Sequence, residues 1–229
     1  MIDRAVKRII SLAVAAMLLL SGCSETRIEL TKEATSISTM DATVMTAETN
    51  NFRCDAAFFG DSITCDGNFD ELLPGLRVVN LGVYGDTIGD LRRRVEQLKA
   101  EEPAVIFLLG GINSLRPDNV ADCLEEYRAL LEEIAAACPR SGLVVQSLLP
   151  VGAELDPEGA QNRAVRSFNE GLRSLSAEKG LSYLDLWPCY EKNGALDPSL
   201  TRDGLHLNFN AYGPWAEAAE PYLGHEASR

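Results

Sequence analysis

The chain of 229 residues carries 21 Lys and Arg against 34 Asp and Glu, so its formal net charge at pH 7 is −13. Such an acidic surface repels phosphate backbones and anionic headgroups, which argues against nucleic acid as a partner. It places no such restriction on neutral sugars or esters.

Residues 1–22 are predicted to be an export signal. Basic residues precede an apolar run over residues 9–20, which is too short to span a bilayer because a span needs about 20 residues. The Leu-Ser-Gly-Cys sequence that ends at Cys23 resembles the lipobox of bacterial lipoproteins. The resemblance implies that Cys23 is lipidated and anchors the protein to the membrane of the cell envelope. An ordinary secretory signal and an uncleaved anchor are the alternatives.

The rest of the chain divides by composition. Residues 23–51 are rich in Thr, Ser, Glu and Ala and show no sustained apolar period, which predicts a flexible tether. Residues 52–224 are numerous enough to form one domain with its own core. Residues 225–229 form a polar tail.

The six cysteines of this chain are poorly placed for disulfides. Cys54 and Cys65 bracket a predicted strand, about 20 Å apart. Cys123 and Cys138 lie on one predicted helix, again about 22 Å apart. We expect mostly free thiols, although the state of each, including Cys189, stays open. The sequence shows no metal-binding cluster and indicates no cofactor.

Five short apolar runs are predicted to be β-strands: residues 56–59, 77–81, 105–109, 143–148 and 183–186. The third and fourth runs are apolar at nearly every position. This is typical of strands that are covered on both faces, as in a parallel sheet.

Amphipathic segments alternate with these strands. Apolar residues recur at helical spacing over residues 88–98, and Thr87 with Asp90 predicts a capping box at the start of that helix. Pro117 is expected in the first turn of a second helix, which Pro139 ends. A third helix is expected to end at Gly180, and a last one to extend over residues 210–219. The alternation predicts an α/β fold, a three-layer α/β/α sandwich with a five-stranded parallel sheet.

Chemically useful residues follow the predicted strands, where an open parallel sheet binds its ligands. Gly60-Asp61-Ser62 follows the first strand, and segments 80–85 and 110–113 follow the second and third. Asp203-Gly204-Leu205-His206 comes after the fifth. The other histidine of the chain, His225, lies in the polar tail, so an imidazole base would be His206. These residue types predict a Ser-His-Asp hydrolase.

In this order, the four segments resemble the blocks of the SGNH, or GDSL, hydrolase family, which has a flavodoxin-like fold. The resemblance implies that Ser62 is the nucleophile, His206 its base and Asp203 the residue that orients the imidazole. It also implies an oxyanion hole made by the N–H groups of Ser62 and Gly82 and the side-chain amide of Asn113.

Each of these residues also has a structural alternative. Ser62 suits a helix N-cap, Gly82 suits a turn with positive φ, and Asn113 suits a cap or a turn. An exposed Asp/His pair is the alternative for residues 203 and 206. Ser114 stands where the family usually has Asp, which changes the local support of the preceding Asn.

We therefore expect an exported, lipid-anchored serine esterase that hydrolyses short acyl esters, especially O-acetyl esters on carbohydrates. One alternative is a lysophospholipase or thioesterase with an apolar groove for a longer acyl chain. The candidate groove residues are Phe69, Leu72, Leu73 and Trp187. Another is a surface-binding lipoprotein with a vestigial site. The oligomeric state stays open.

Overall fold

The computed structural model describes residues 52–224. The export signal, the lipidation site at Cys23, the tether and the C-terminal tail lie outside the described residues and stay predictions. None of the helices within residues 52–224 combines the length and the apolar character that a membrane crossing requires.

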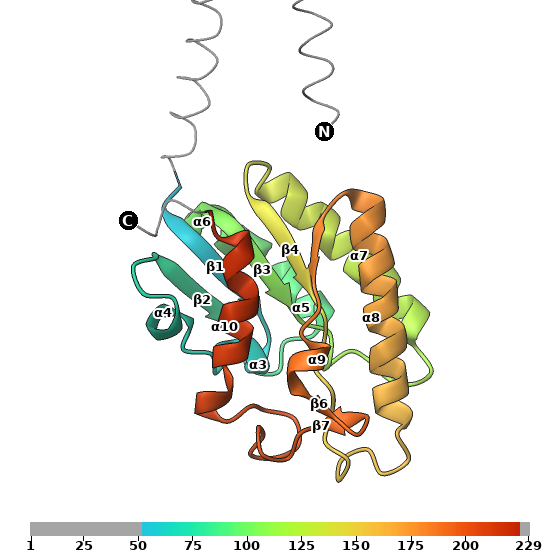
Figure 1. The fold of residues 1–229 in the computed structure, drawn as a ribbon. Coiled ribbons are helices and arrows are strands. Elements are labelled where there is room, and N and C mark those ends of the chain that lie inside the picture. Colours follow the sequence, from blue (N-terminus) through green and yellow to red (C-terminus); the bar gives the residue numbers. More distant parts are fainter. Residues whose placement is uncertain (1–51, 225–229) are drawn as a thin grey trace, which may run out of the picture. The chain divides into compact units, whose positions relative to one another are not determined.

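A five-stranded sheet forms the centre of the fold (Figure 1). Its strands are β1 (Cys54–Gly60), β2 (Val78–Gly82), β3 (Pro103–Leu109), β4 (Gly142–Gln146) and β5 (Ser182–Leu184). They run in the order β2-β1-β3-β4-β5, and every neighbouring pair is parallel. This is the flavodoxin-like order. The predicted five-stranded parallel sheet is confirmed.

Helices cover both faces of the sheet. They are α3 (Ser62–Cys65), α4 (Phe69–Leu72), α5 (Ile88–Arg93), α6 (Val95–Glu101), α7 (Val120–Ala137), α8 (Ala160–Lys179), α9 (Trp187–Tyr190) and α10 (Gly213–Ala219). Because α7 contacts α5, α6 and α8, these four form one layer, whereas α10 contacts α4 on the other face (Figure 1). The fold is thus the predicted three-layer sandwich.

Short elements complete the C-terminal part of the described chain. They are the hairpin of β6 (Glu191–Lys192) with β7 (Ala195–Leu196) and the 3-10 turns η1 (Phe209–Ala211) and η2 (Glu220–Tyr222). None of these was expected from the sequence, because each is too short to show an apolar period.

Aromatic side chains fill the space between β1 and the layer of α4 and α10. The ring of Phe58 stacks on those of Phe69 and Phe107, with centroids 3.7 and 4.8 Å away. Trp215 of α10 meets the Phe69 ring edge-on at 5.1 Å and is fully buried. The strand that leads to the candidate nucleophile is therefore held in a rigid, close-packed core.

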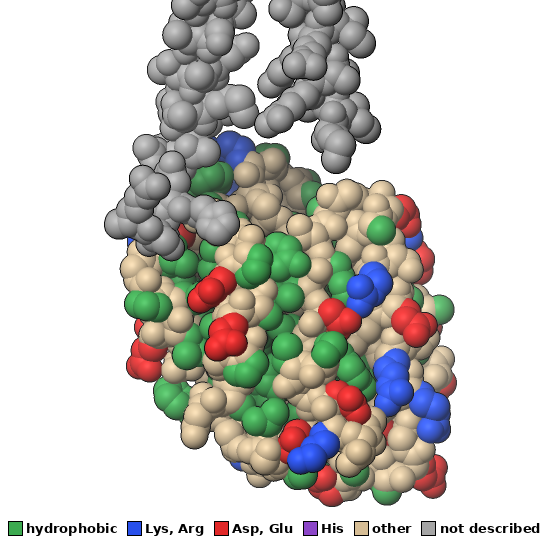
Figure 2. Space-filling view, in the orientation of Figure 1, with side chains coloured by type: hydrophobic (Ala, Val, Ile, Leu, Met, Phe, Trp, Pro, Cys, Tyr) green, Lys and Arg blue, Asp and Glu red, His purple; other side chains and the backbone are tan. Residues whose placement is uncertain are grey.

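Charged side chains of both signs are interspersed on the side of the domain where α8 lies (Figure 2). Two ion pairs connect α7 with α8, Arg128–Glu178 at 2.5 Å and Lys179–Glu132 at 2.8 Å. Because the carboxylate of each pair is more than half exposed, each pair contributes little to stability. The apolar stripes of the two helices carry most of their packing energy.

Two of the predicted helix ends are confirmed. Thr87 and Asp90 form the predicted capping box at the start of α5. Gly180 ends α8 with φ 66°, in the left-handed region that favours glycine.

Other helix predictions were wrong in detail. The helix expected over residues 88–98 is broken into α5 and α6 at Arg94. Pro117 is not in a first helical turn, because α7 begins only at Val120, after its N-cap Asn119. The side chain of Asn119 accepts the N–H of Arg116 and so closes a turn before the helix. The last helix begins only at Gly213, after a 3-10 turn.

The five cysteines within the described residues are all free, whereas the sequence predicted only that most of them would be. Cys54, Cys123 and Cys138 are buried, and Cys65 and Cys189 are partly buried. Burial raises the pKa of the Cys54 thiol to about 11 and disfavours its reactive thiolate form.

Candidate active site

The site lies at the edge of the sheet where the central strands end. Gly60, the last residue of β1, pairs with Gly82 of β2 on one side and with Leu109 of β3 on the other. A Cβ atom on Gly60 would lie 2.1 Å from the Leu109 carbonyl oxygen. Only glycine therefore allows β3 to approach the strand end that carries the candidate nucleophile.

Ser62 stands directly after this strand end and is the first residue of α3. Asp61, not Ser62, is the N-cap: its Oδ1 accepts the N–H of Ile63 at 3.0 Å. The capping alternative for Ser62 is thus wrong, and its hydroxyl is free for another partner. A buried bond of 2.7 Å from the Tyr212 hydroxyl to the Ile63 carbonyl fixes α3 to the segment before α10.

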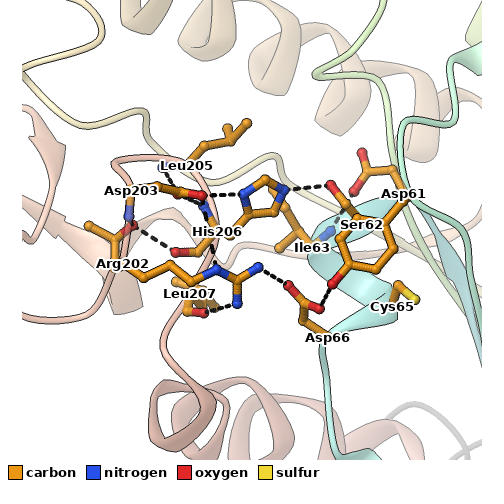
Figure 3. Close-up of polar contacts among 12 residues, drawn as sticks. Asp61, Ser62, Ile63, Cys65, Asp66, Arg202, Asp203, Leu205, His206 and Leu207 are labelled. Carbon is orange, nitrogen blue, oxygen red and sulfur yellow. Dashed lines mark hydrogen bonds and ion pairs between the residues drawn. The ribbon is translucent and has the colours of Figure 1, made fainter.

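A chain of hydrogen bonds joins Ser62 to the Asp203–His206 turn (Figure 3). Ser62 Oγ lies 2.9 Å from His206 Nε2, and His206 Nδ1 lies 2.7 Å from Asp203 Oδ2. With Asp203 ionised, the Nδ1–H donates to its carboxylate, which leaves Nε2 to accept the hydroxyl proton of Ser62. The structure thus brings together three predicted residues that are up to 144 positions apart in the sequence.

The turn itself is closed by hydrogen bonds. Asp203 Oδ1 accepts the backbone N–H groups of Leu205 at 3.0 Å and His206 at 2.7 Å. Partial burial alone would raise the pKa of Asp203, but the bonds from His206 and Leu205 outweigh it and lower this pKa to about 2. Asp203 is therefore a carboxylate at any ordinary assay pH.

Asp66 fastens this turn to the nucleophile helix. Its carboxylate accepts from Arg202 Nη2 at 2.5 Å (Figure 3). It also accepts from the Tyr84 hydroxyl. Asp66 is also the C-cap of α3, and its N–H donates to the Ser62 carbonyl. Asp66 therefore links the segments that carry Ser62, Tyr84 and His206.

The predicted donors of an oxyanion hole are only partly available. The N–H of Ser62 has no partner within residues 52–224. Asn113 donates one amide hydrogen to the Asp86 carbonyl at 2.9 Å and keeps a second. Gly82 does not fit this role, because its N–H already donates to Asn80 Oδ1 at 2.9 Å. The assignment of Gly82 is therefore corrected.

Gly82 is required for packing and not for a positive φ. A Cβ atom there would lie 2.2 Å from the backbone nitrogen of Cys65, so glycine lets β2 end against α3.

Gly85 fits the donor role better than Gly82 does. Its N–H has no partner among the described residues, and its φ of 79° favours glycine. It lies between Tyr84, whose ring centroid is 6.3 Å from that of His206, and Asp86, whose carbonyl holds Asn113. Gly85 lies in the segment that the sequence predicted to contribute a donor, three residues after the glycine that ends the strand.

Ser114, which departs from the usual family pattern, has a definite structural partner. Its hydroxyl accepts the N–H of Ile88 at 2.9 Å, at the start of α5. Asn119 Nδ2 donates to the Ser114 carbonyl at 3.0 Å. The segment that carries Asn113 is thus anchored to the starts of α5 and α7 without the usual Asp.

Asp61 is a buried carboxyl group that is not part of the Ser-His-Asp arrangement. Its side chain is inaccessible to solvent, and Oδ2 has no hydrogen-bond partner within the described residues. Burial raises its pKa to about 7, and the bond from the Ile63 N–H and the proximity of His206 offset this only in part.

The raised pKa of Asp61 predicts a pH-dependent gain from Asp61→Asn. Above pH 4 the unfolded chain releases this proton while the folded chain keeps it up to about pH 7, so the native aspartate loses stability as pH rises. Asparagine caps the helix equally well. The variant's advantage in free energy of unfolding should grow between pH 4 and 7, by up to about 1.4 kcal/mol per pH unit. Urea unfolding at pH 5 and pH 8 measures it.

Asp70→Asn, on the exposed side of α4, provides the control for this measurement. It removes a carboxyl group that faces solvent, whereas Asp61→Asn removes one from the interior. A difference between Asp61→Asn and the wild type that stays constant with pH would contradict the raised pKa of Asp61.

Comparisons with known proteins agree with the geometry. Residues 58–213 match the GDSL-like lipase/acylhydrolase family. No curated protein matches the sequence.

Solved structures share the fold at low sequence identity. A protein from Streptococcus pneumonia has a TM-score of 0.65 and 22% identity, over 88% of this chain and 100% of that chain. The acetyl xylan esterase AlAXEase has a TM-score of 0.63 and 21% identity, over 74% and 99%. A catalytic mutant of the acetylxylan esterase Axe2 from Geobacillus stearothermophilus has a TM-score of 0.60 and 22% identity, over 76% and 95%.

The family match extends over most of the described domain, from within β1 to the start of α10. It includes the segments that carry Ser62, Asn113 and His206. The chain therefore belongs to the GDSL-like lipase/acylhydrolase family and is a GDSL-type esterase.

Proposed function

We propose that this esterase uses Ser62 as its nucleophile, His206 as general base and acid, and Asp203 to orient the imidazole. The observation that carries the proposal is the continuous chain of hydrogen bonds, 2.9 and 2.7 Å long, from Ser62 Oγ through both ring nitrogens to the carboxylate. A serine hydroxyl is almost wholly protonated at neutral pH, so it needs such a base.

The reaction then follows from the geometry. His206 Nε2 takes the hydroxyl proton as Ser62 Oγ bonds to the ester carbonyl carbon. The imidazolium, stabilised by Asp203, gives this proton to the leaving alcohol when the carbon–oxygen bond of the ester breaks. A water molecule, deprotonated by His206, attacks the acyl-enzyme and releases the acid, and the proton returns to Ser62 Oγ.

The developing oxyanion requires hydrogen-bond donors that are free before the substrate binds. The N–H groups of Ser62 and Gly85 and the second amide hydrogen of Asn113 meet this requirement within residues 52–224. The loss of one such donor typically lowers turnover by about 10²- to 10³-fold. Gly85 thus takes the role first assigned to Gly82.

We favour short acyl groups because the side chains considered for an acyl groove are engaged in packing. Phe69 and Leu73 are buried in the core. Leu72 and Trp187 are partly buried and pack against it. Two of the similar structures are acetylxylan esterases, which supports acetyl groups.

Exposed apolar side chains beside the site favour a sugar as the alcohol component. Tyr84 and Phe209 are 58% and 62% exposed. Tyr84 lies beside the His206 ring, and Phe209 follows that histidine by three residues. A flat aromatic face next to the catalytic imidazole suits the apolar face of a pyranose ring. We therefore propose O-acetylated carbohydrate as the substrate.

The alternatives have less support. A lysophospholipase or thioesterase would need a groove that the buried side chains of Phe69 and Leu73 do not line. A vestigial binding lipoprotein would not be expected to retain hydrogen-bond geometry at both nitrogens of His206.

The substrate proposal predicts a steep preference for short acyl groups. For p-nitrophenyl esters from acetyl to decanoyl, we expect kcat/KM for acetyl to exceed that for octanoyl by at least about tenfold, because the four candidate groove side chains are engaged in packing and do not take up the methylenes of a longer chain. Faster turnover of octanoyl esters would contradict it and favour the lysophospholipase alternative.

Acetylated xylo-oligosaccharides test the alcohol side in the same experiment. Tyr84→Ala should raise KM for the acetylated sugar several-fold while leaving KM for p-nitrophenyl acetate nearly unchanged. Tyr84→Phe is the matched control, since it keeps the ring and removes only the bond to Asp66. Equal effects on both substrates would argue against a sugar platform.

A further inference from the structure

Arg94 lies between α5 and α6 and takes no part in the reaction steps above. It is the C-cap of the first helix and the N-cap of the second, with φ −106° and ψ 5°. Only 15% of its side chain is exposed. A guanidinium that is largely removed from water needs partners for its donors, so the partners of Arg94 indicate its role.

The Arg94 side chain binds three segments that border the active site. Nη2 donates to the carbonyls of Gly60 at 3.1 Å and Leu81 at 3.2 Å. Nε donates to Asp86 Oδ2 at 2.6 Å, in an ion pair whose carboxylate is 9% exposed. The guanidinium also lies over the ring of Phe59, 4.8 Å from its centroid.

These contacts lead directly to the proposed oxyanion donors. Gly60 precedes Ser62 by two residues, so its carbonyl fixes the strand end from which the nucleophile projects. Asp86 follows Gly85, and its backbone carbonyl accepts the Asn113 amide at 2.9 Å. Arg94 thus binds the side chain of Asp86, and the main-chain carbonyl of Asp86 binds the side-chain amide of Asn113.

We propose that Arg94 and Asp86 form a positioning pair, which fixes the oxyanion donors of Ser62, Gly85 and Asn113 relative to one another. The inference rests on the proposed function, because an oxyanion hole matters only if acyl transfer occurs. The rigid fork of a guanidinium serves several acceptors at once, which the point charge of a lysine does not. Donors fixed in advance stabilise the transition state without reorganisation, so the pair acts on rate more than on substrate binding.

The test is a double-mutant cycle with Asn113→Ala, measured on p-nitrophenyl acetate. Arg94→Met and Asp86→Asn should each lower kcat by about 10- to 100-fold and change KM by less than about threefold. In the Asn113→Ala background, Arg94→Met should lower kcat by a smaller factor than in the wild type, because one of the three donors that the pair positions is already absent. If Arg94→Met only damaged the structure in general, the separate fold-losses in kcat of Arg94→Met and Asn113→Ala would multiply in the double variant.

Arg92→Met is the matched control. Arg92 lies on α5 and forms an ion pair with Glu133 at 2.6 Å on the surface, so its loss should leave kcat unchanged. Thermal unfolding of every variant separates folding from rate, and Arg94→Lys, which keeps the charge, serves if the methionine variant does not fold.

Equal losses in both backgrounds, or an unchanged kcat in a folded Arg94 variant, would overturn the positioning role. Full activity of Ser62→Ala would overturn the proposed function instead, so the two failures are distinguishable.

Discussion

Replacement of Ser62 by alanine is expected to abolish labelling by a fluorophosphonate and to lower kcat for ester hydrolysis by about 10⁴- to 10⁶-fold. Alanine removes the Oγ atom that lies 2.9 Å from His206 Nε2 and keeps the backbone N–H. Because Ser62 is 4% exposed and its hydroxyl does not cap α3, the variant should fold normally. Mass spectrometry of the labelled protein and steady-state kinetics measure the two effects.

Cys65 provides the control, since it lies on the same short helix. Burial and the charge of Asp66 raise the pKa of its thiol, which makes a reactive thiolate scarce. The Cys65→Ala variant should therefore still be labelled by the fluorophosphonate, and its kcat should fall by less than about threefold. A label that persists in Ser62→Ala and disappears in Cys65→Ala would reassign the nucleophile. A folded wild-type protein that takes up no label would exclude a serine mechanism.

The sheet could be predicted from local signals, and the Ser-His-Asp arrangement from local motifs together with a rule of sheet topology. Strands such as β3 are buried on both faces, so apolar residues at nearly every position reveal them. The candidate base could be identified because His206 is one of two histidines and the other lies in a polar tail. The topological rule for strand ends then placed it near Ser62.

The oxyanion donor was harder to predict because two glycines lie three residues apart in one segment. Which N–H is free depends on where the side chain of Asn80 points, and it bonds to Gly82. The bond between Asn80 and Gly82 depends on the backbone conformation of the folded segment, which neither the apolar pattern nor residue preferences predict. The positive φ of Gly85 is likewise visible only in the folded backbone.

The break at Arg94 was missed for a related reason. Apolar residues on both sides of it, Leu91 and Val95, are buried, so the helical stripe continues across the interruption. An arginine at this position is compatible with the exposed face of one long helix. The Arg94 side chain points inward because it donates to the carbonyls of Gly60 and Leu81. These strand ends lie within its reach only in the folded domain.

Replacement of Asp203 by asparagine is expected to lower kcat by about 10⁴-fold while leaving the fold unchanged. Asparagine keeps an oxygen that accepts the N–H groups of Leu205 and His206. It presents an N–H group to His206 Nδ1 in place of an acceptor, so the ring proton moves to Nε2. The nitrogen that faces Ser62 then carries a proton and no longer accepts one.

Asp197→Asn is the matched control for this change. Asp197 Oδ1 accepts the N–H of Ser199 at 2.9 Å, a turn bond like that of Asp203, but its other oxygen faces Lys192 and no histidine. Its loss should change kcat by less than about threefold. Since the pKa of Asp203 is about 2, no part of an activity profile above pH 5 reflects its titration. If both variants lost activity equally, the effect of Asp203→Asn would come from the turn and not from the imidazole tautomer.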